Sequence, residues 1–174
     1  SGKGGVAYVL SREFGLELPK PMHPEVGILV NEKADSESRE LAADEIYQTF
    51  KAEFLQKNDP LRLLSYETQK IVGEGDDVKC SVSIELDGEA RQIEGQGNGP
   101  INAFVNALEN ENLKDFKLTD YRQHSIGGGS ATESAAFVQL QTKAGRVAYG
   151  CGIDSSIEKS GIMALVSAFN RTRS

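Results

Sequence analysis

The hydrophobic pattern of this chain changes its period near Pro60. Before that point, apolar residues recur every three or four positions, which is typical of helices with one buried face. After it they alternate with polar residues, which is typical of strands with one buried face. The sequence therefore predicts a small helical subdomain over residues 1–57 and a second, strand-rich domain over residues 60–174.

Two amphipathic helices are expected in the first part. Their apolar positions are Met22, Val26, Leu29 and Val30 in the first, and Ile46, Tyr47, Phe50 and Phe54 in the second. Residues 34–39 between them are charged and contain serine, so we expect a solvated loop there. Asn58-Asp59-Pro60 ends the helical pattern and marks the expected domain boundary.

The strand-rich part is expected to contain the same unit twice, three strands followed by a helix. The expected strands cover residues 61–72, 78–86, 89–94, 116–126, 134–142 and 146–153. The first helix should begin at Pro100, because proline suits the first helical turn. The second should begin near Ser156, where Ser155 and Glu158 have the spacing of a capping box.

The two expected helices support an internal duplication. Residues 101–108 align with residues 162–169 at an offset of 162 − 101 = 61, with four of eight positions identical. Each sheet must cover its apolar face with its helix, and two adjacent units would share one core. The predicted fold class is therefore α+β, an internally duplicated βββα domain preceded by the helical subdomain.

Charge and composition exclude several classes of function. The chain carries 19 Lys+Arg and 26 Asp+Glu, a net charge of −7, and no basic cluster, so we expect neither nucleic acid nor membrane as a partner. No apolar run approaches the ~20 residues that span a bilayer. With only Cys80 and Cys151, both expected to be reduced, the chain is expected to be a soluble cytoplasmic protein.

The glycine-rich segment Gly95-Gln96-Gly97-Asn98-Gly99-Pro100 lies where a strand ends and a helix begins. Free backbone N–H groups at a helix start form a good seat for a carboxylate. The alternative is a tight turn with no ligand. A dinucleotide site is disfavoured, because proline occupies the third glycine position of that fingerprint and the strands are joined by hairpins.

The second copy of this turn, Gly150 to Ser155, adds Asp154. Its carboxylate either receives a ligand ammonium or serves as a charge or cap at the helix start. The segment Gly127-Gly128-Gly129-Ser130 is either a plain mobile loop or a lid over a site.

No catalytic or metal-binding arrangement is evident in the sequence. His23 and His124 lie on different expected elements without a nucleophile or a ligand at a suggestive spacing, so we expect structural roles for both. The chain is therefore expected to have no catalytic residues, no metal site and no cofactor of its own.

Several motifs resemble those of the longer 2-isopropylmalate synthases. They are Ser1 to Tyr8, Gly97-Asn98-Gly99-Pro100, Asp120-Tyr121, His124, the glycine-rich loop, Gly152-Ile153 and Val166 to Arg171. The resemblance implies that this chain is a part of such an enzyme, cut away from an N-terminal catalytic barrel. In the family that barrel uses a divalent metal to condense acetyl-CoA with 2-oxoisovalerate, and the C-terminal domain dimerises and binds L-leucine.

The resemblance also implies an effector pocket and its partners. The leucine-binding residues it implies are Gly97, Asn98, Gly99, Pro100, Ile101, Tyr121, Ser125, Thr132, Ile153 and Asp154. Ile101, Tyr121 and Ile153 are expected to form an apolar slot for the isobutyl group. The expected partners are L-leucine, a second copy of the chain and the chain's own catalytic barrel, while the fragment itself is expected to be inactive.

Two other functions remain open at this point. One is the isoleucine-sensing regulatory domain of a citramalate synthase, since the slot residues do not separate two branched isomers. The other is a ligand-free dimerisation module. The three closely spaced glycines Gly95, Gly97 and Gly99 argue against a ligand-free module, because packing alone is not expected to need all three.

Overall fold

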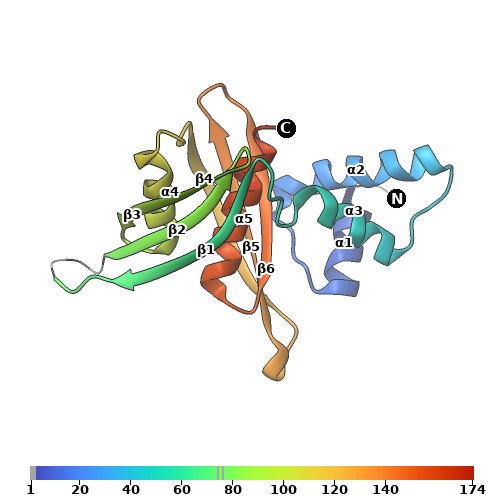
Figure 1. The fold of residues 1–174 in the computed structure, drawn as a ribbon. Coiled ribbons are helices and arrows are strands. Elements are labelled where there is room, and N and C mark those ends of the chain that lie inside the picture. The colour runs from blue at the N-terminus through green and yellow to red at the C-terminus, as the bar shows by residue number, and fades with distance from the viewer. Residues whose placement is uncertain (1–2, 74, 76) are drawn as a thin grey trace.

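The computed structural model describes residues 3–73, 75 and 77–174, so Ser1 and Gly2 of the first motif lie outside the described residues. Helices come first, followed by two three-stranded antiparallel sheets, each with its own helix (Figure 1). The α+β class and the duplicated βββα unit are confirmed. No described helix has the length and apolar character needed to cross a membrane.

The helical part consists of three α-helices and a short 3-10 turn. Their bounds are α1 Lys3–Phe14, η1 Lys20–Met22, α2 His23–Glu37 and α3 Ala43–Phe54. The loop predicted over residues 34–39 is wrong in its first part, because α2 continues to Glu37. A polar composition does not by itself stop a helix, and α2 ends only at Ser38, whose left-handed backbone (φ 53°) terminates it.

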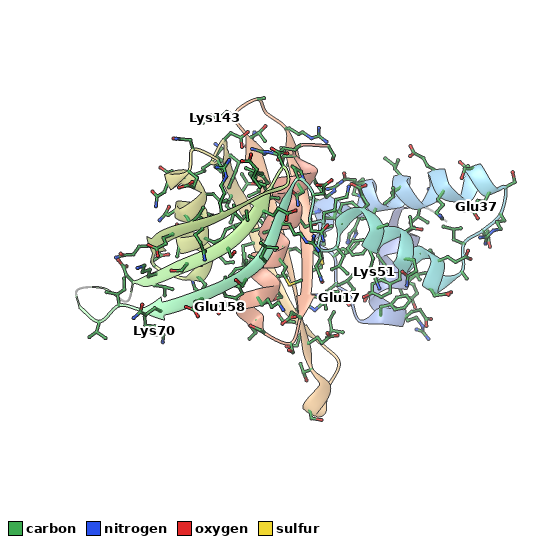
Figure 2. All side chains as sticks on the ribbon, viewed as in Figure 1. Glu17, Glu37, Lys51, Lys70, Lys143 and Glu158 are labelled. Atoms are coloured by element: carbon green, nitrogen blue, oxygen red, sulfur yellow. The ribbon has the colours of Figure 1, made fainter. Side chains whose placement is uncertain are left out.

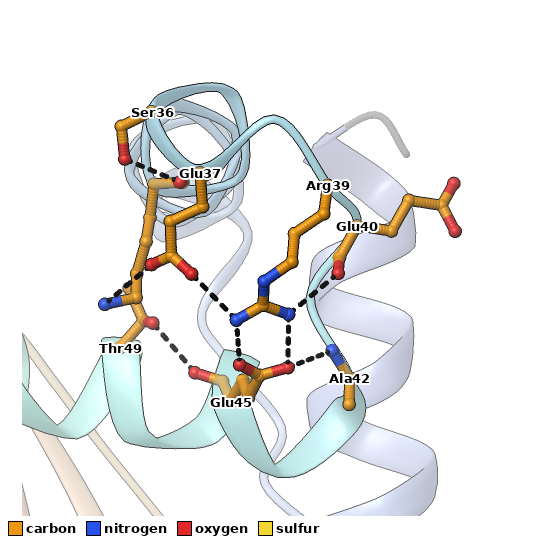
Figure 3. A network of polar contacts seen from close by, with 8 residues as sticks. Ser36, Glu37, Arg39, Glu40, Ala42, Glu45 and Thr49 are labelled. Atoms are coloured by element: carbon orange, nitrogen blue, oxygen red, sulfur yellow. Dashed lines mark hydrogen bonds and ion pairs between the residues drawn. The ribbon is translucent and has the colours of Figure 1, made fainter.

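The ends of α2 and α3 are joined by an ionic network around Arg39 (Figure 3). The Arg39 guanidinium donates to Glu37 at 2.7 Å and to both carboxylate oxygens of Glu45. The Glu45 carboxylate also accepts from the Ala42 backbone N–H at 3.0 Å, which caps α3. The hydrogen bond from Arg39 lowers the pKa of Glu45 to about 2.

The first βββα unit contains β1 Leu61–Lys70, β2 Val78–Leu86, β3 Glu89–Gly97 and α4 Pro100–Asn110. The second contains β4 Phe116–Ile126, β5 Glu133–Thr142, β6 Val147–Asp154 and α5 Ile157–Arg171. In each sheet the strands pair in chain order. The first strand of each unit has an irregular register directly after a leucine, Leu63 in β1 and Leu118 in β4.

Both units contribute to one shared core. Alternate residues of β2 are buried, and they join side chains of α4, α5 and β5 in a single apolar cluster. Helix α5 lies between the two sheets, packing on β5 and β6 and touching β1 and α4 (Figure 1). The opposite face of the second sheet, with Phe137, Tyr149 and Cys151, forms a second cluster with the helical part.

Glycines allow each helix to pack very closely on its own sheet. A Cβ at Gly95 would lie 2.2 Å from the Ala107 nitrogen, and one at Gly150 would lie 2.1 Å from the Ala168 nitrogen. Ala107 and Ala168 are equivalent under the duplication, so the two units repeat the same close contact. Contrary to expectation, packing therefore does need a glycine at position 95, and also at position 97, where a Cβ on Gly97 would lie 2.9 Å from the Ala103 nitrogen.

The segment between α3 and β1 is bound along the second unit. Leu55 forms an isolated parallel bridge with Cys151, and the Gln56 N–H donates to the Cys151 carbonyl at 2.9 Å. The buried side chain of Asn170 donates to the Lys57 and Leu61 carbonyls and accepts from the Leu61 N–H. The boundary placed at residues 57–60 stays a prediction, but this joint is extensively hydrogen-bonded.

Arg171, at the end of α5, anchors the helical part to the second unit. Its buried guanidinium donates to Glu25 on α2 at 2.9 Å, to Glu53 on α3 at 2.8 Å and to the Tyr149 carbonyl at 2.8 Å. Burial opposes ionisation of Glu53, yet the hydrogen bond and charge of Arg171 outweigh it and lower the pKa of Glu53.

Helix α5 is capped one residue later than expected. Ser156, not Ser155, is the N-cap residue, and its side chain accepts from the Lys159 N–H at 3.2 Å. Glu158 takes no part in a capping box. Its carboxylate instead accepts from the Tyr66 hydroxyl of β1 at 3.3 Å, and Figure 2 shows Glu158 on this side of α5.

Candidate functional site

A cavity of about 570 Å³ lies between the start of α4 and the first half of β4. Half of its lining comes from residues that the sequence predicted for the effector pocket, namely Asn98, Gly99, Pro100, Ile101 and Tyr121. The other lining residues are Asn102, Val105, Lys114, Lys117 and Leu118. The glycine turn and Tyr121 are thus brought together, although they lie on different βββα units.

The start of α4 offers donors to this cavity. Gly99 is the N-cap residue, so no side chain caps the helix, and Pro100 follows it in the first turn without an N–H group. The N–H groups of Ile101 and Asn102 are left as donors for an anion at the positive end of the helix. A Cβ at Gly99 would meet no atom within 4 Å, so this glycine borders open space.

Ile101 and Tyr121 form an apolar wall that rests on α5. A Cβ at Gly161 would lie 2.7 Å from the Tyr121 hydroxyl oxygen and 2.9 Å from Ile101 Cδ1. Only a glycine at this position leaves room for both side chains as they stand. Sequence reasoning missed Gly161, because nothing near it in the chain indicates that side chains from α4 and β4 meet there. Burial raises the pKa of Tyr121.

Sequence reasoning also missed two cations of the cavity. Lys114 lines it from the segment before β4, and Lys117 lines it from β4 itself. Lys114 is partly engaged by Glu109 on α4 at 3.3 Å. Within the part of the chain that the structure describes, the lining includes no carboxylate, so a bound anion would meet attraction from both lysines and from the helix start.

Gly97 lies beside the cavity but does not line it. Its missing side chain lets β3 approach the backbone of Asn102 and Ala103 in α4. The Asn102 amide donates to Asn98 Oδ1 at 3.1 Å, which fixes both amides at the cavity edge. Gly97 therefore shapes the turn that carries the donors.

Three predicted site residues lie away from this cavity. Ser125 pairs with Ser134 beyond Tyr121, about 13 Å along the extended strand at ~3.3 Å per residue. Thr132 donates to the Gly129 carbonyl in the loop after β4, and the residues that line the cavity include none from that loop. Ile153 packs into the second cluster, on the other face of its sheet, so one chain does not bring it together with Ile101, and the slot that includes it stays a prediction.

Asp154 is likewise engaged elsewhere. Its carboxylate accepts from the Ser156 N–H at 2.9 Å and lies 3.7 Å from the Lys159 ammonium. Of the two roles left open for Asp154, these contacts correspond to a charge at a helix start, within a single chain.

Both histidines make structural contacts. His124 accepts from the Glu17 N–H at 3.1 Å and contacts the Ser125 carbonyl, which joins β4 to the helical part. His23 contacts the Leu18 carbonyl at 3.1 Å. Among residues 3–73, 75 and 77–174, no group of three or more His, Cys, Asp or Glu side chains is arranged to hold a metal ion.

Comparisons with known proteins agree with the motif resemblance. Over 176 residues the chain is 38% identical to the 2-isopropylmalate synthase of Clostridium acetobutylicum, covering 99% of this chain and 31% of that protein. It is 35% identical to the 2-isopropylmalate synthase of Corynebacterium efficiens, covering 98% of this chain and 29% of that protein. The chain thus spans less than a third of the length of these relatives. Residues 40–173 match the family described as the LeuA allosteric (dimerisation) domain, and the chain therefore belongs to this family.

Proposed function

We propose that this chain is the leucine-sensing regulatory region of a 2-isopropylmalate synthase. The observation that carries the proposal is the cavity at the start of α4, which gathers five residues implied by the family resemblance around one helix start. The family description, an allosteric dimerisation domain, supports a regulatory role.

Leucine suits the chemistry of this cavity. Its carboxylate would be met by the N–H groups of Ile101 and Asn102 and by Lys117. Its isobutyl group would lie against Ile101, Tyr121 and Leu118, and burying such a group contributes roughly 2 kcal/mol. The side-chain oxygens of Asn98 and Asn102 are acceptors for its ammonium, in place of the expected Asp154.

Calorimetric titration with leucine, isoleucine and valine tests the proposal. Tightest binding of leucine is expected, together with a rise in melting temperature, since the effector would bind only the folded state. Preference for isoleucine would favour the citramalate synthase alternative. An absence of heat and of any thermal shift with all three amino acids would favour a ligand-free dimerisation module.

A matched pair of variants localises the site. Gly99→Val should abolish leucine binding without unfolding the chain, because position 99 has an extended backbone and open space around it. Gly128→Val is the control, since Gly128 is also extended and open but lies in the loop after β4. Tyr121→Ala should weaken binding by removing one wall. Equal loss of binding in the two glycine variants would argue against this location.

We also propose that two copies of the chain associate through residues 60–174, with the effector cavities at or near the interface. The family description supports dimerisation, and Tyr121 keeps 38% of its surface exposed at the cavity. Sedimentation at tens of micromolar should give a dimer, and a stable monomer there would contradict this part of the proposal.

The proposed parent enzyme condenses acetyl-CoA with 2-oxoisovalerate in a barrel that holds a divalent metal, and it acts in the cytoplasm. The match to proteins named 2-isopropylmalate synthase supports this assignment. The chain alone should release no thiol from acetyl-CoA in the presence of 2-oxoisovalerate. Release above background from the purified chain would overturn that expectation.

A further inference from the structure

A second cavity, of about 560 Å³, lies between β1 and α5. One end is bordered by residues 56–58 of the segment that connects the helical part to β1. The lining residues are Gln56, Lys57, Asn58, Arg62, Leu63, Leu64, Ser65, Tyr66, Lys159, Met163 and Val166. None of them belongs to the cavity at α4.

The helix positions of the two cavities correspond under the duplication. At the offset of 61 residues, Asn98, Asn102 and Val105 of the first cavity become Lys159, Met163 and Val166, which all line the second. The two helices also use equivalent alanines, Ala107 and Ala168, to contact their sheets. The same helix face therefore borders both cavities.

The strand positions repeat as well. The first cavity uses a basic residue, a leucine and a tyrosine at Lys117, Leu118 and Tyr121. The second uses Arg62, Leu63 and Tyr66 at the same spacing, and the register irregularity follows the leucine in both strands. Each cavity thus lies between the helix of one unit and the first strand of the other, so the duplication has produced two related cavities.

The two cavities differ in charge. Lys57, Arg62 and Lys159 line the second cavity, and no carboxylate is found among the described residues that line it. Lys57 and Lys159 make only loose ion pairs, at 3.4 Å with Glu53 and at 3.7 Å with Asp154. The first cavity has the side-chain amides of Asn98 and Asn102. At the equivalent positions the second has the ammonium of Lys159 and the thioether of Met163. Two carboxylates lie next to lining residues without lining the cavity themselves, since Glu158 accepts from the Tyr66 hydroxyl at 3.3 Å and Glu85 is the cross-strand partner of Arg62. The three lining cations therefore favour a ligand carboxylate over a ligand ammonium.

We propose that the cavity between β1 and α5 is a second ligand site, which binds a small aliphatic carboxylate that lacks an ammonium group. Arg62 and Lys159 hold the carboxylate, since guanidinium groups match carboxylates with paired hydrogen bonds. Leu63, Met163 and Val166 provide the apolar floor for the aliphatic part.

The site borders the joint between the two parts of the chain. The Lys57 N–H donates to Ser167 Oγ at 3.0 Å, and the Lys57 carbonyl accepts from Asn170 at 2.8 Å, so the backbone of this lining residue is fixed. A ligand here contacts the connecting segment directly, which the first cavity does not.

The probe is 4-methylpentanoate, which has the carboxylate and isobutyl group of leucine but no ammonium. Titration of the full chain should show binding that weakens with added salt, because the cations are partly exposed. Amide shifts should appear over residues 62–66 and 159–166. Leucine at the same concentration should perturb these amides less than the probe does.

Two variants with the same charge change provide the decisive comparison. Arg62→Gln should weaken binding of the probe at least about fivefold through loss of a charge-assisted contact. Arg146→Gln, in the exposed turn before β6, should leave binding unchanged. Lys159→Gln gives a second measurement should the Arg62 variant fold poorly. The second site would be overturned by any of three results: amide shifts confined to residues 98–102, equal affinity of the probe in all variants, or no binding of the probe. Failure of leucine to bind would overturn only the proposed effector function.

Discussion

Tyr121 of β4 and Gly161 of α5 are in direct contact, since a Cβ added at Gly161 would lie only 2.7 Å from the Tyr121 hydroxyl oxygen. The same added atom would lie 2.9 Å from Ile101 on α4. One glycine therefore supports two walls of the cavity that come from two different units. The shape of this cavity depends on how the units pack against each other.

Gly161→Ala should weaken leucine binding about tenfold, a change of about 1.4 kcal/mol in binding free energy. The atoms that a methyl group would meet are the ends of side chains, which can shift, so the fold should persist while the walls move. Calorimetry measures the affinity and circular dichroism checks the fold. Gly128→Ala serves as the control, and equal affinity in both variants would contradict the role of Gly161.

Gly150→Ala should lower the free energy of unfolding by about 3 kcal/mol, at the upper end of overpacking effects. The new methyl group would overlap the α5 backbone, at 2.1 Å from the Ala168 nitrogen and 2.6 Å from the Ala164 carbonyl oxygen. A backbone inside a packed helix cannot move aside as a side chain does. Urea denaturation measures the change, and Gly95→Ala should behave alike because it repeats the contact in the first unit. If Gly150→Ala were as stable as Gly128→Ala, α5 would have to shift freely away from its sheet, which would contradict the prediction.

Arg171→Ala should destabilise the chain by about 3 kcal/mol and loosen the helical part, because Glu25, Glu53 and the Tyr149 carbonyl lose their shared donor. The guanidinium also lies 4.0 Å from the centre of the Phe54 ring, and this contact is lost too. The substitution should accelerate amide hydrogen exchange in α2 and α3 more than it does in β2. Arg146→Ala, which removes an exposed guanidinium, is the control, and unchanged exchange in α2 and α3 would refute the anchoring role.

The Arg39–Glu45 pair should make stability depend on pH in the acid range. The pKa of Glu45 falls from its ordinary value of 4.5 to about 2, so the pair stabilises the folded chain fully above pH 4.5. This stabilisation is lost as the pH falls toward 2. Melting temperatures at low salt should therefore decline less steeply between pH 5 and 2 in Glu45→Gln than in the original chain. Glu40→Gln should keep the original slope, since the Glu40 carboxylate points away from Arg39 (Figure 3).

Much of the fold follows from local patterns that the sequence displays directly. The strict alternation over residues 78–86 and the Asp87-Gly88 turn predicted β2 with its observed bounds. The end of α2 was missed because its polar last turn is still helical, and the stop depends on the backbone angle of Ser38 rather than on composition. The one-residue error at the α5 cap has a similar origin, since Ser155 and Ser156 are equivalent choices until the backbone is known.

Only part of the candidate site could be predicted from the sequence. The glycine turn before α4 and Tyr121 carry recognisable motifs, and both line the cavity. The contact of Tyr121 with Gly161 and the placement of Ile153 on the other face of its sheet depend on how strands and units pair across long stretches of chain. Local patterns determine which face of an element is apolar, but not which distant element covers that face.

The anchoring of the helical part on β6 and α5 has a consequence for the order of folding during synthesis. Ser167, Asn170 and Arg171 bind residues that precede them by 109 to 146 positions. The ribosome therefore releases α1, α2 and α3 long before their docking surface exists. Phe50 and Phe54 share their apolar cluster with Phe137 and Tyr149 of β5 and β6, and Arg171 lies over Phe54, so the helical part is completed only after strands and a helix that are made later.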